Sequence, residues 1–68
     1  MNIKDIEPYA GKSVQIFLKN DLKFTTIMPD FIEPKSTSIQ ITDRFGCLIT
    51  IEIDMIDLIQ EVRHYASN

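Results

Sequence analysis

Residues 47–59 read C-L-I-T-I-E-I-D-M-I-D-L-I, and this stretch decides the fold. Its first half is rich in β-branched residues and alternates between isoleucine and polar residues from Ile49 to Ile53, which is typical of a half-buried strand. We therefore predict a strand from Cys47 to Ile53. The face expected toward the core holds Cys47, Ile49, Ile51 and Ile53, and the opposite face holds Leu48, Thr50 and Glu52.

The second half of the stretch fits two structures. Met55, Leu58, Ile59 and Val62 have the spacing of one helix face, and Asp54 is a suitable helix cap. A tight turn at Asp54-Met55 followed by a short strand over 56–62 fits equally well. Periodicity alone does not separate a short strand from a helix here.

The residues before this stretch predict a short helix and three strands. Asn2–Ala10 has apolar residues at helical spacing, with Asn2 as cap, Pro8 as a reason for the helix to be short, and Gly11 as a stop. Strands are expected over Ser13–Lys19, Leu22–Met28 and Ile39–Thr42. Tight turns are expected at Asn20-Asp21 and at 43–46, where Gly46 permits positive φ. Two prolines make 29–38 a break between strands.

Composition predicts one small domain. The chain has 68 residues, of which 44% are hydrophobic. A core of this size is marginal, and such chains often depend on disulfides, metals or self-association. Cys47 is the only cysteine and His64 the only histidine, so neither an internal disulfide nor a metal cluster is expected. We predict no metal and no cofactor, and we expect self-association.

Charge and hydropathy bear on partners and location. The net charge is −3, and the excess of acidic residues lies after Cys47. An acidic balance argues against strong nucleic-acid binding. The N-terminus is polar and no segment approaches the roughly 20 apolar residues of a membrane span, so we expect no membrane association. With a single unpaired cysteine, the chain is expected to be cytoplasmic.

Three segments give the chain a resemblance to the Sm, LSm and Hfq family. They are I-x-x-I-x-x-Y-x-G-K at 3–12, V-Q-I-F-L-K-N at 14–20, and I-T-I-E-I-D-M-I-D-L-I at 49–59. The resemblance implies a small, strongly bent five-stranded barrel, Sm-like or SH3-like, with a short N-terminal helix. The whole chain would be one domain, with the helix at about 2–10 and the barrel at about 13–62. The last residues would form a short C-terminal tail.

In the family, the fourth and fifth strands form the contacts between subunits of a ring. The resemblance therefore implies a homo-oligomer assembled through the corresponding strands here. The candidate interface residues are Leu48, Ile49, Ile51, Ile53, Ile56, Leu58 and Ile59.

The family's RNA-binding residues are largely replaced. Members that bind uridine-rich RNA carry Asp and Asn after the second strand, and here only Asp30 is a displaced equivalent. The Arg-Gly or Lys-His pair near the end of the fourth strand is replaced by Glu52-Ile53-Asp54. We expect RNA binding that is weak or at a non-standard surface, in post-transcriptional regulation. The candidate residues combine cations and aromatic rings, which suit phosphates and bases, with Asp30. They are Lys12, Phe17, Lys19, Lys23, Asp30, Arg44 and Phe45.

Two other interpretations stay open. The acidic residues Glu52, Asp54, Asp57 and Glu61 would suit a basic protein partner, in a scaffold module with no nucleic-acid role, or would only form a solvated face. The other open interpretation is that the chain is a monomeric SH3-type barrel. No catalytic group of residues is visible, so we predict no enzyme. We expect Cys47 to be a buried small hydrophobe and not a nucleophile.

Overall fold

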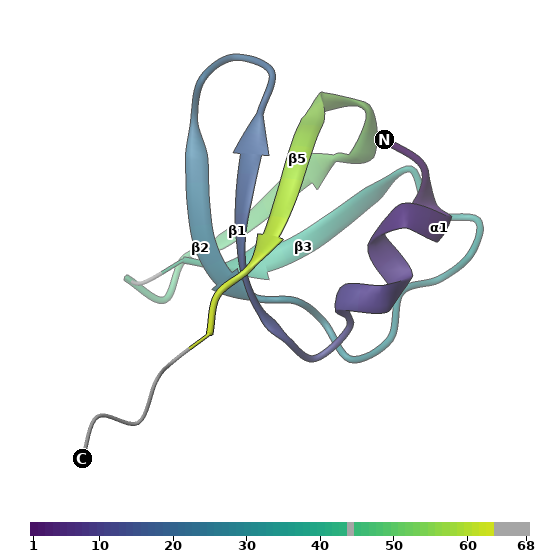
Figure 1. Cartoon of the computed structure of the whole chain (residues 1–68), viewed down its shortest axis with the longest axis horizontal. Coiled ribbons are helices and arrows are strands. Elements are labelled where there is room, and N and C mark those ends of the chain that lie inside the picture. The colour runs from purple at the N-terminus through teal and green to yellow at the C-terminus, as the bar shows by residue number, and fades with distance from the viewer. Residues whose placement is uncertain (44, 64–68) are drawn as a thin grey trace.

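The computed structural model describes residues 1–43 and 45–63, which form five strands and one short N-terminal helix (Figure 1). The mostly β class and the N-terminal helix are confirmed. The strands are β1 (Ser13–Leu18), β2 (Lys23–Ile27), β3 (Ser38–Thr42), β4 (Leu48–Glu52) and β5 (Ile56–Glu61). They form two antiparallel sheets, in the orders β2-β1-β5 and β3-β4. Closure of the strands into one barrel stays a prediction.

The N-terminal helix is short, as the sequence predicts. α1 spans Ile3–Ile6 and continues into one 3-10 turn, η1 (Glu7–Tyr9), which contains Pro8. The Asn2 side chain accepts a hydrogen bond from the Lys4 amide, and the Asp5 carboxylate accepts one from the Asn2 amide. These reciprocal bonds satisfy amides that have no partner within the helix. Ile6 is fully buried, so α1 is part of the core.

The turn between β1 and β2 lies where the sequence predicts it. Asp21 adopts a positive φ of 71°, which Asp tolerates better than most residues. The Asn20 side chain accepts from the Leu22 amide at 3.2 Å, and the Leu18 amide donates to the Leu22 carbonyl at 2.8 Å. This turn fixes the β1–β2 register, in which Phe17 lies opposite Lys23.

Residues 56–61 form a strand, which resolves the ambiguity after Asp54. One 3-10 turn, η2 (Ile53–Met55), joins β4 to β5. The register of β5 against β1 shifts near Asp57, because Phe17 pairs with Leu58 whereas Leu18 pairs with Ile56. An extra residue in a strand is a β-bulge. It brings both Ile56 and Ile59 to the core although they are three residues apart, which produces the helix-like spacing in the sequence.

The core lies between the two sheets and under the loop that joins β2 to β3. Its members are aliphatic side chains from every strand except β2, from α1, from η2 and from the loops. They are Ile6, Val14, Ile16, Met28, Ile32, Ile39, Ile41, Ile51, Ile53, Ile56 and Ile59.

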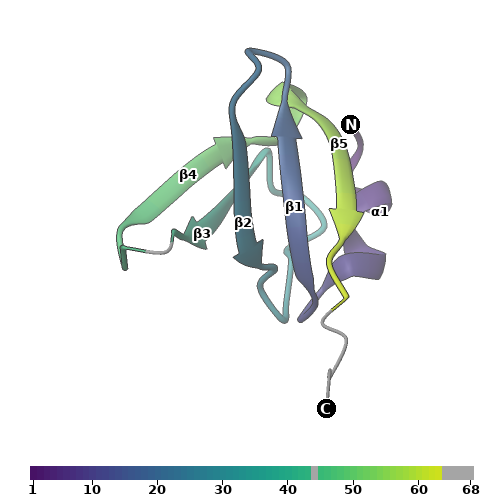
Figure 2. The same ribbon diagram turned by 60° about the vertical axis from the view of Figure 1, so that its left-hand side comes forward.

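The β3–β4 hairpin extends beyond this core, and Figure 2 shows it projecting to the side of the β2–β1–β5 sheet. Burial along one face of β4 therefore falls toward the turn: Ile51 is buried, Ile49 half-buried and Cys47 exposed. The prediction of a buried Cys47 is wrong. The residue has the core-facing parity, but it directly precedes β4 at the end of the hairpin that projects from the core.

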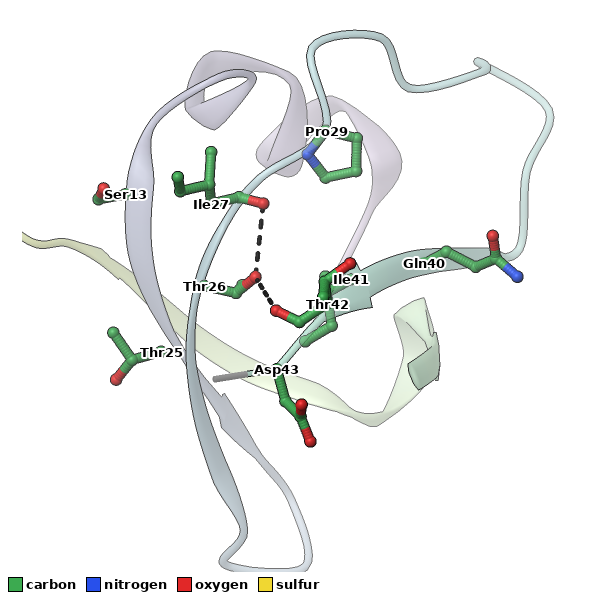
Figure 3. A pocket seen from close by; sticks show the side chains of 9 residues that line it. All are labelled: Ser13, Thr25, Thr26, Ile27, Pro29, Gln40, Ile41, Thr42 and Asp43. Atoms are coloured by element: carbon green, nitrogen blue, oxygen red, sulfur yellow. Dashed lines mark hydrogen bonds between the residues drawn. The ribbon is translucent and has the colours of Figure 1, made fainter. Parts of the chain in front are cut away.

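Among the described residues, one side-chain hydrogen bond joins the two sheets. The hydroxyl of Thr26, which is 8% exposed, donates to the Thr42 carbonyl oxygen at 3.0 Å and lies 3.5 Å from the Ile27 carbonyl oxygen (Figure 3). No backbone hydrogen bond joins β2 to β3 within residues 1–43 and 45–63. Thr26 thus links strands that the ladders leave separate. In the described part of the chain, no helix has the length and apolar character needed to cross a membrane.

Candidate functional site

The start of β2 and the turn between β3 and β4 enclose a hollow of about 640 Å³. We call it the Lys23 hollow. Its lining is Lys23, Phe24, Thr25, Asp43 and Phe45. It brings together a cation and two aromatic rings from segments about 20 positions apart in the sequence.

The β3–β4 turn holds one wall of the Lys23 hollow in place. The Asp43 Oδ1 atom accepts hydrogen bonds from the amides of Phe45 at 2.8 Å and Cys47 at 2.9 Å. The Gly46 amide donates to the Asp43 carbonyl at 3.0 Å, and Gly46 has a φ of +82°. An Asp side chain that bonds the following amides is a common way to build a tight turn. The turn presents the Phe45 ring, which is 77% exposed.

The outer face of the β2–β1–β5 sheet adjoins the Lys23 hollow at Lys23. Phe17 lies opposite Lys23 on β2 and opposite Leu58 on β5, so the three side chains form one row across the sheet. Phe17 is half-buried and Leu58 is 47% exposed. An aromatic ring therefore lies on the outer face, opposite the cation that borders the hollow.

The Lys23 hollow contains one positive and one negative side chain, Lys23 and Asp43. Lys23 forms no ion pair with any carboxylate in the described residues, so its ammonium group is available to an anion. Asp43 faces the same hollow, but its Oδ1 atom accepts two amides. An aromatic ring, a free cation and a polar hydroxyl suit a flat ligand with an attached phosphate, such as a nucleotide.

The candidate RNA-binding residues separate into two groups. Phe17, Lys19, Lys23 and Phe45 lie toward the Lys23 hollow and the β1–β2 turn. Lys12 lies at the opposite end of β1, where its Nζ atom is 3.5 Å from Glu61 Oε1.

Asp30 also lies at that opposite end, because a Cβ atom added to Gly11 would be 2.9 Å from Asp30 Oδ1. The structure therefore does not bring Lys12 and Asp30 to the hollow. Arg44, another candidate, lies outside the described residues, and so does His64.

Three residues that line the Lys23 hollow, Phe24, Thr25 and Asp43, are not among the candidate residues predicted from the sequence. The sequence carries a signal for Asp43, because Asp at the first position of a turn ending in Gly is typical of a side-chain-capped turn. No comparable signal exists for Thr25, since its position depends on how far β3 lies from β2.

Most of the candidate interface residues face the interior of the chain itself. Ile51, Ile53, Ile56 and Ile59 are buried and Ile49 is half-buried. Leu48 at 71% and Leu58 at 47% are exposed. A contact between subunits through β4 and β5 would therefore use the strand edges and these two leucines.

The acidic residues form no metal-binding group. Glu52, Asp54, Asp57 and Glu61 are all exposed, and within the described residues Glu61 is the one of the four that has an ion-pair partner, Lys12. Among residues 1–43 and 45–63, no three His, Cys, Asp or Glu side chains lie close enough to hold a metal ion together.

The chain was compared with protein-family models, curated proteins and solved structures, and none of the three comparisons gave a match.

Proposed function

We propose that this chain is a self-assembling binding module of the Sm-like type, in which five strands complete a small barrel and several copies form a ring. The module binds single-stranded RNA weakly through the Lys23 hollow, a surface different from the standard pocket of the family. The observation that carries the proposal is that, among the described strands, β4 and β5 each have a hydrogen-bonded neighbour on one side only.

The free edge of β4 follows from its pairing with β3. The Asp43 amide bonds the Cys47 carbonyl, and the Ile53 amide bonds the Thr37 carbonyl. In an antiparallel ladder, alternate residues direct their main-chain groups toward the partner strand. Leu48, Thr50 and Glu52 therefore direct their amides and carbonyls away from β3.

The free edge of β5 follows in the same way. The Val62 amide bonds the Ser13 carbonyl, and Gln60 lies opposite Gln15. The alternation then directs the main-chain groups of Ile59 and Glu61 away from β1. An edge of this kind is a template for another strand. Pairing of β4 in one copy with β5 in the next would satisfy both edges and continue around a ring.

The oligomeric state tests the assembly. Light scattering coupled to gel filtration at micromolar concentration should give several times the mass of one chain. Thr50→Pro removes an outward amide and leaves the β3–β4 ladder bonds in place, so the mass should fall toward that of the monomer. Thr50→Ala keeps the amide and should keep the oligomer. A monomeric unaltered protein would disprove the ring.

RNA binding is tested separately. Gel shifts with labelled U-rich and A-rich single strands should show complexes at low salt that weaken as salt rises. Lys23→Ala and Phe45→Ala should each reduce binding, by about one to two powers of ten for the loss of a stacking ring. Lys12→Ala, at the other end of β1, should not. The RNA proposal fails if neither RNA binds at high micromolar protein concentration.

A second candidate function is an acidic docking surface for a basic protein partner. It is favoured by three exposed carboxylates at the β4–β5 corner, those of Glu52, Asp54 and Asp57, which have no ion-pair partner in the described residues. A pull-down with the unaltered chain and with Asp54→Lys plus Asp57→Lys tests it. A partner that binds both proteins equally would rule this surface out.

A further inference from the structure

The edge of β3 that faces β2 is also unpaired. The ladder bonds to β4 come from Thr37 and Asp43 and from every second residue between them. Ser38, Gln40 and Thr42 therefore direct their main-chain amides and carbonyls away from β4. The Thr42 carbonyl accepts a hydrogen bond from the Thr26 hydroxyl, whereas the outward main-chain groups of Ser38 and Gln40 have no hydrogen-bond partner among residues 1–43 and 45–63.

A groove runs along this edge. It consists of two adjoining hollows of about 580 Å³ and 410 Å³, which share Pro29 and Gln40 in their linings. Figure 3 shows the first of them, with β2 and Pro29 on one side and β3 on the other. The hollows follow β3 from Asp43 back to Ser38, so the open main-chain groups of β3 lie along the groove.

β2 does not occupy this edge, because it crosses β3 near one end. The contact between Thr26 and Thr42 is direct, and β3 diverges from β2 and the segment after it toward Gln40 (Figure 3). Pro29 follows β2 almost at once, and a proline has no amide to donate to a ladder. Within the described residues, no strand therefore pairs with Ser38 and Gln40 on this edge.

The side chains around the groove indicate the chemistry of an occupant. Ile27 is 66% exposed and Phe31 is 75% exposed, which provides apolar contacts at the side of the groove opposite β3. Asp43 and Glu33 are the charged side chains among the described lining residues, and both are acidic. An apolar ligand with positive charge complements this combination.

We propose that the groove along β3 binds an extended peptide segment of a partner protein, in which apolar and basic residues alternate. The segment adds to β3 as a strand. Its main chain exchanges hydrogen bonds with Ser38 and Gln40, its apolar side chains contact Ile27 and Phe31, and its basic side chains face Asp43 and Glu33. Strand addition of this kind draws affinity from main-chain bonds and selectivity from alternate side chains. The site is separate from the ring edges and adjoins the Lys23 hollow, with which it shares Thr25 and Asp43.

The first test uses the unaltered protein and a short capped peptide of alternating lysine and valine. Titration followed by amide NMR should shift the Ser38 and Gln40 signals and slow their hydrogen exchange. The matched peptide with glutamate in place of lysine should bind at least about tenfold more weakly, because it meets acidic side chains. Equal binding of the two peptides, or shifts confined to β4 and β5, would overturn the proposal.

The second test removes the main-chain donor. Gln40→Pro eliminates the groove-facing amide and spares the β3–β4 ladder, so peptide affinity should fall about tenfold. Gln40→Ala and Thr50→Pro should each leave the affinity within about twofold, because neither changes a main-chain group in the groove. If Thr50→Pro abolishes peptide binding and Gln40→Pro does not, the peptide adds to the assembly edge, and the groove proposal is wrong while the ring proposal stands.

A methylated peptide gives a readout that does not depend on mutant folding. N-methylation of alternate peptide residues removes the donors that face β3 in one register and leaves them in the other. One methylated series should lose binding and the other should keep it. If neither series lost binding, the peptide would contact the groove through its side chains alone, and strand addition would be contradicted.

Discussion

At the scale of single residues, Gly11 joins η1 to β1 under two separate constraints. Its φ is +73°, a conformation that costs other residues about 1–2 kcal/mol, and a Cβ there would be 2.9 Å from Asp30 Oδ1. Gly11→Ala should lower the free energy of unfolding in urea by about that amount or more.

Gly46 is a control that has the backbone constraint without the steric one. Its φ is +82°, and no atom lies within 4 Å of a Cβ added there. Gly46→Ala should show the backbone cost alone. Adding Asp30→Ala to the Gly11 variant should bring its loss down to that level. A larger loss at Gly46 than at Gly11 would contradict the role given to Asp30.

Thr26 is the second residue with a clear role, because its buried hydroxyl is the polar link between the sheets. Thr26→Val keeps the shape and leaves the Thr42 carbonyl without its partner, so unfolding should become easier by about 1–3 kcal/mol. Thr25→Val, on the same strand at an exposed position, should change stability by less than about 0.5 kcal/mol. Equal effects at the two positions in denaturant unfolding would mean that the link contributes nothing.

Single positions also show where sequence patterns stop being informative. Ile49, Ile51 and Cys47 share one parity and only the first two pack inward, because burial depends on how far other elements reach along β4. The same limit applies to the Lys23 hollow. Lys23 and Phe45 are recognisable as binding residue types, but their proximity depends on the angle between two sheets that no local pattern encodes.

At the scale of elements, local chemistry was sufficient for α1, for the turns and for the approximate bounds of β1 to β4. Asn2, Asp21 and Gly46 have conformations or hydrogen bonds that their residue types favour. β5 was ambiguous for a physical reason. The bulge near Asp57 changes the burial period from two to three, which imitates a helix face.

α1 provides an element-scale prediction because it is very short and yet contributes a fully buried side chain. Ile6→Ala should cost about 2–5 kcal/mol through lost apolar contact and a cavity. Ile27→Ala, at a 66% exposed position, should cost far less. Thermal and urea unfolding of both variants provide the measurement. A small loss at Ile6 would show that the helix is an appendage to the strands and not part of their core.

At the scale of the whole molecule, the question is how a 68-residue chain without a disulfide gains enough stability. Assembly through β4 and β5 would add main-chain bonds and cover Leu48 and Leu58. Stability that comes from association depends on concentration by mass action. The thermal midpoint of the unaltered protein should therefore rise as its concentration is raised from low to high micromolar.

The Thr50→Pro variant makes that prediction decisive. A variant that cannot pair through β4 should melt at one temperature whatever its concentration, whereas Thr50→Ala should keep the dependence of the unaltered chain. If the midpoint of the unaltered protein does not change with concentration, the core alone supplies the stability. The unpaired edges of β4 and β5 would then have to be protected by their exposed charges, Glu52, Asp57 and Glu61, which discourage edge-to-edge pairing.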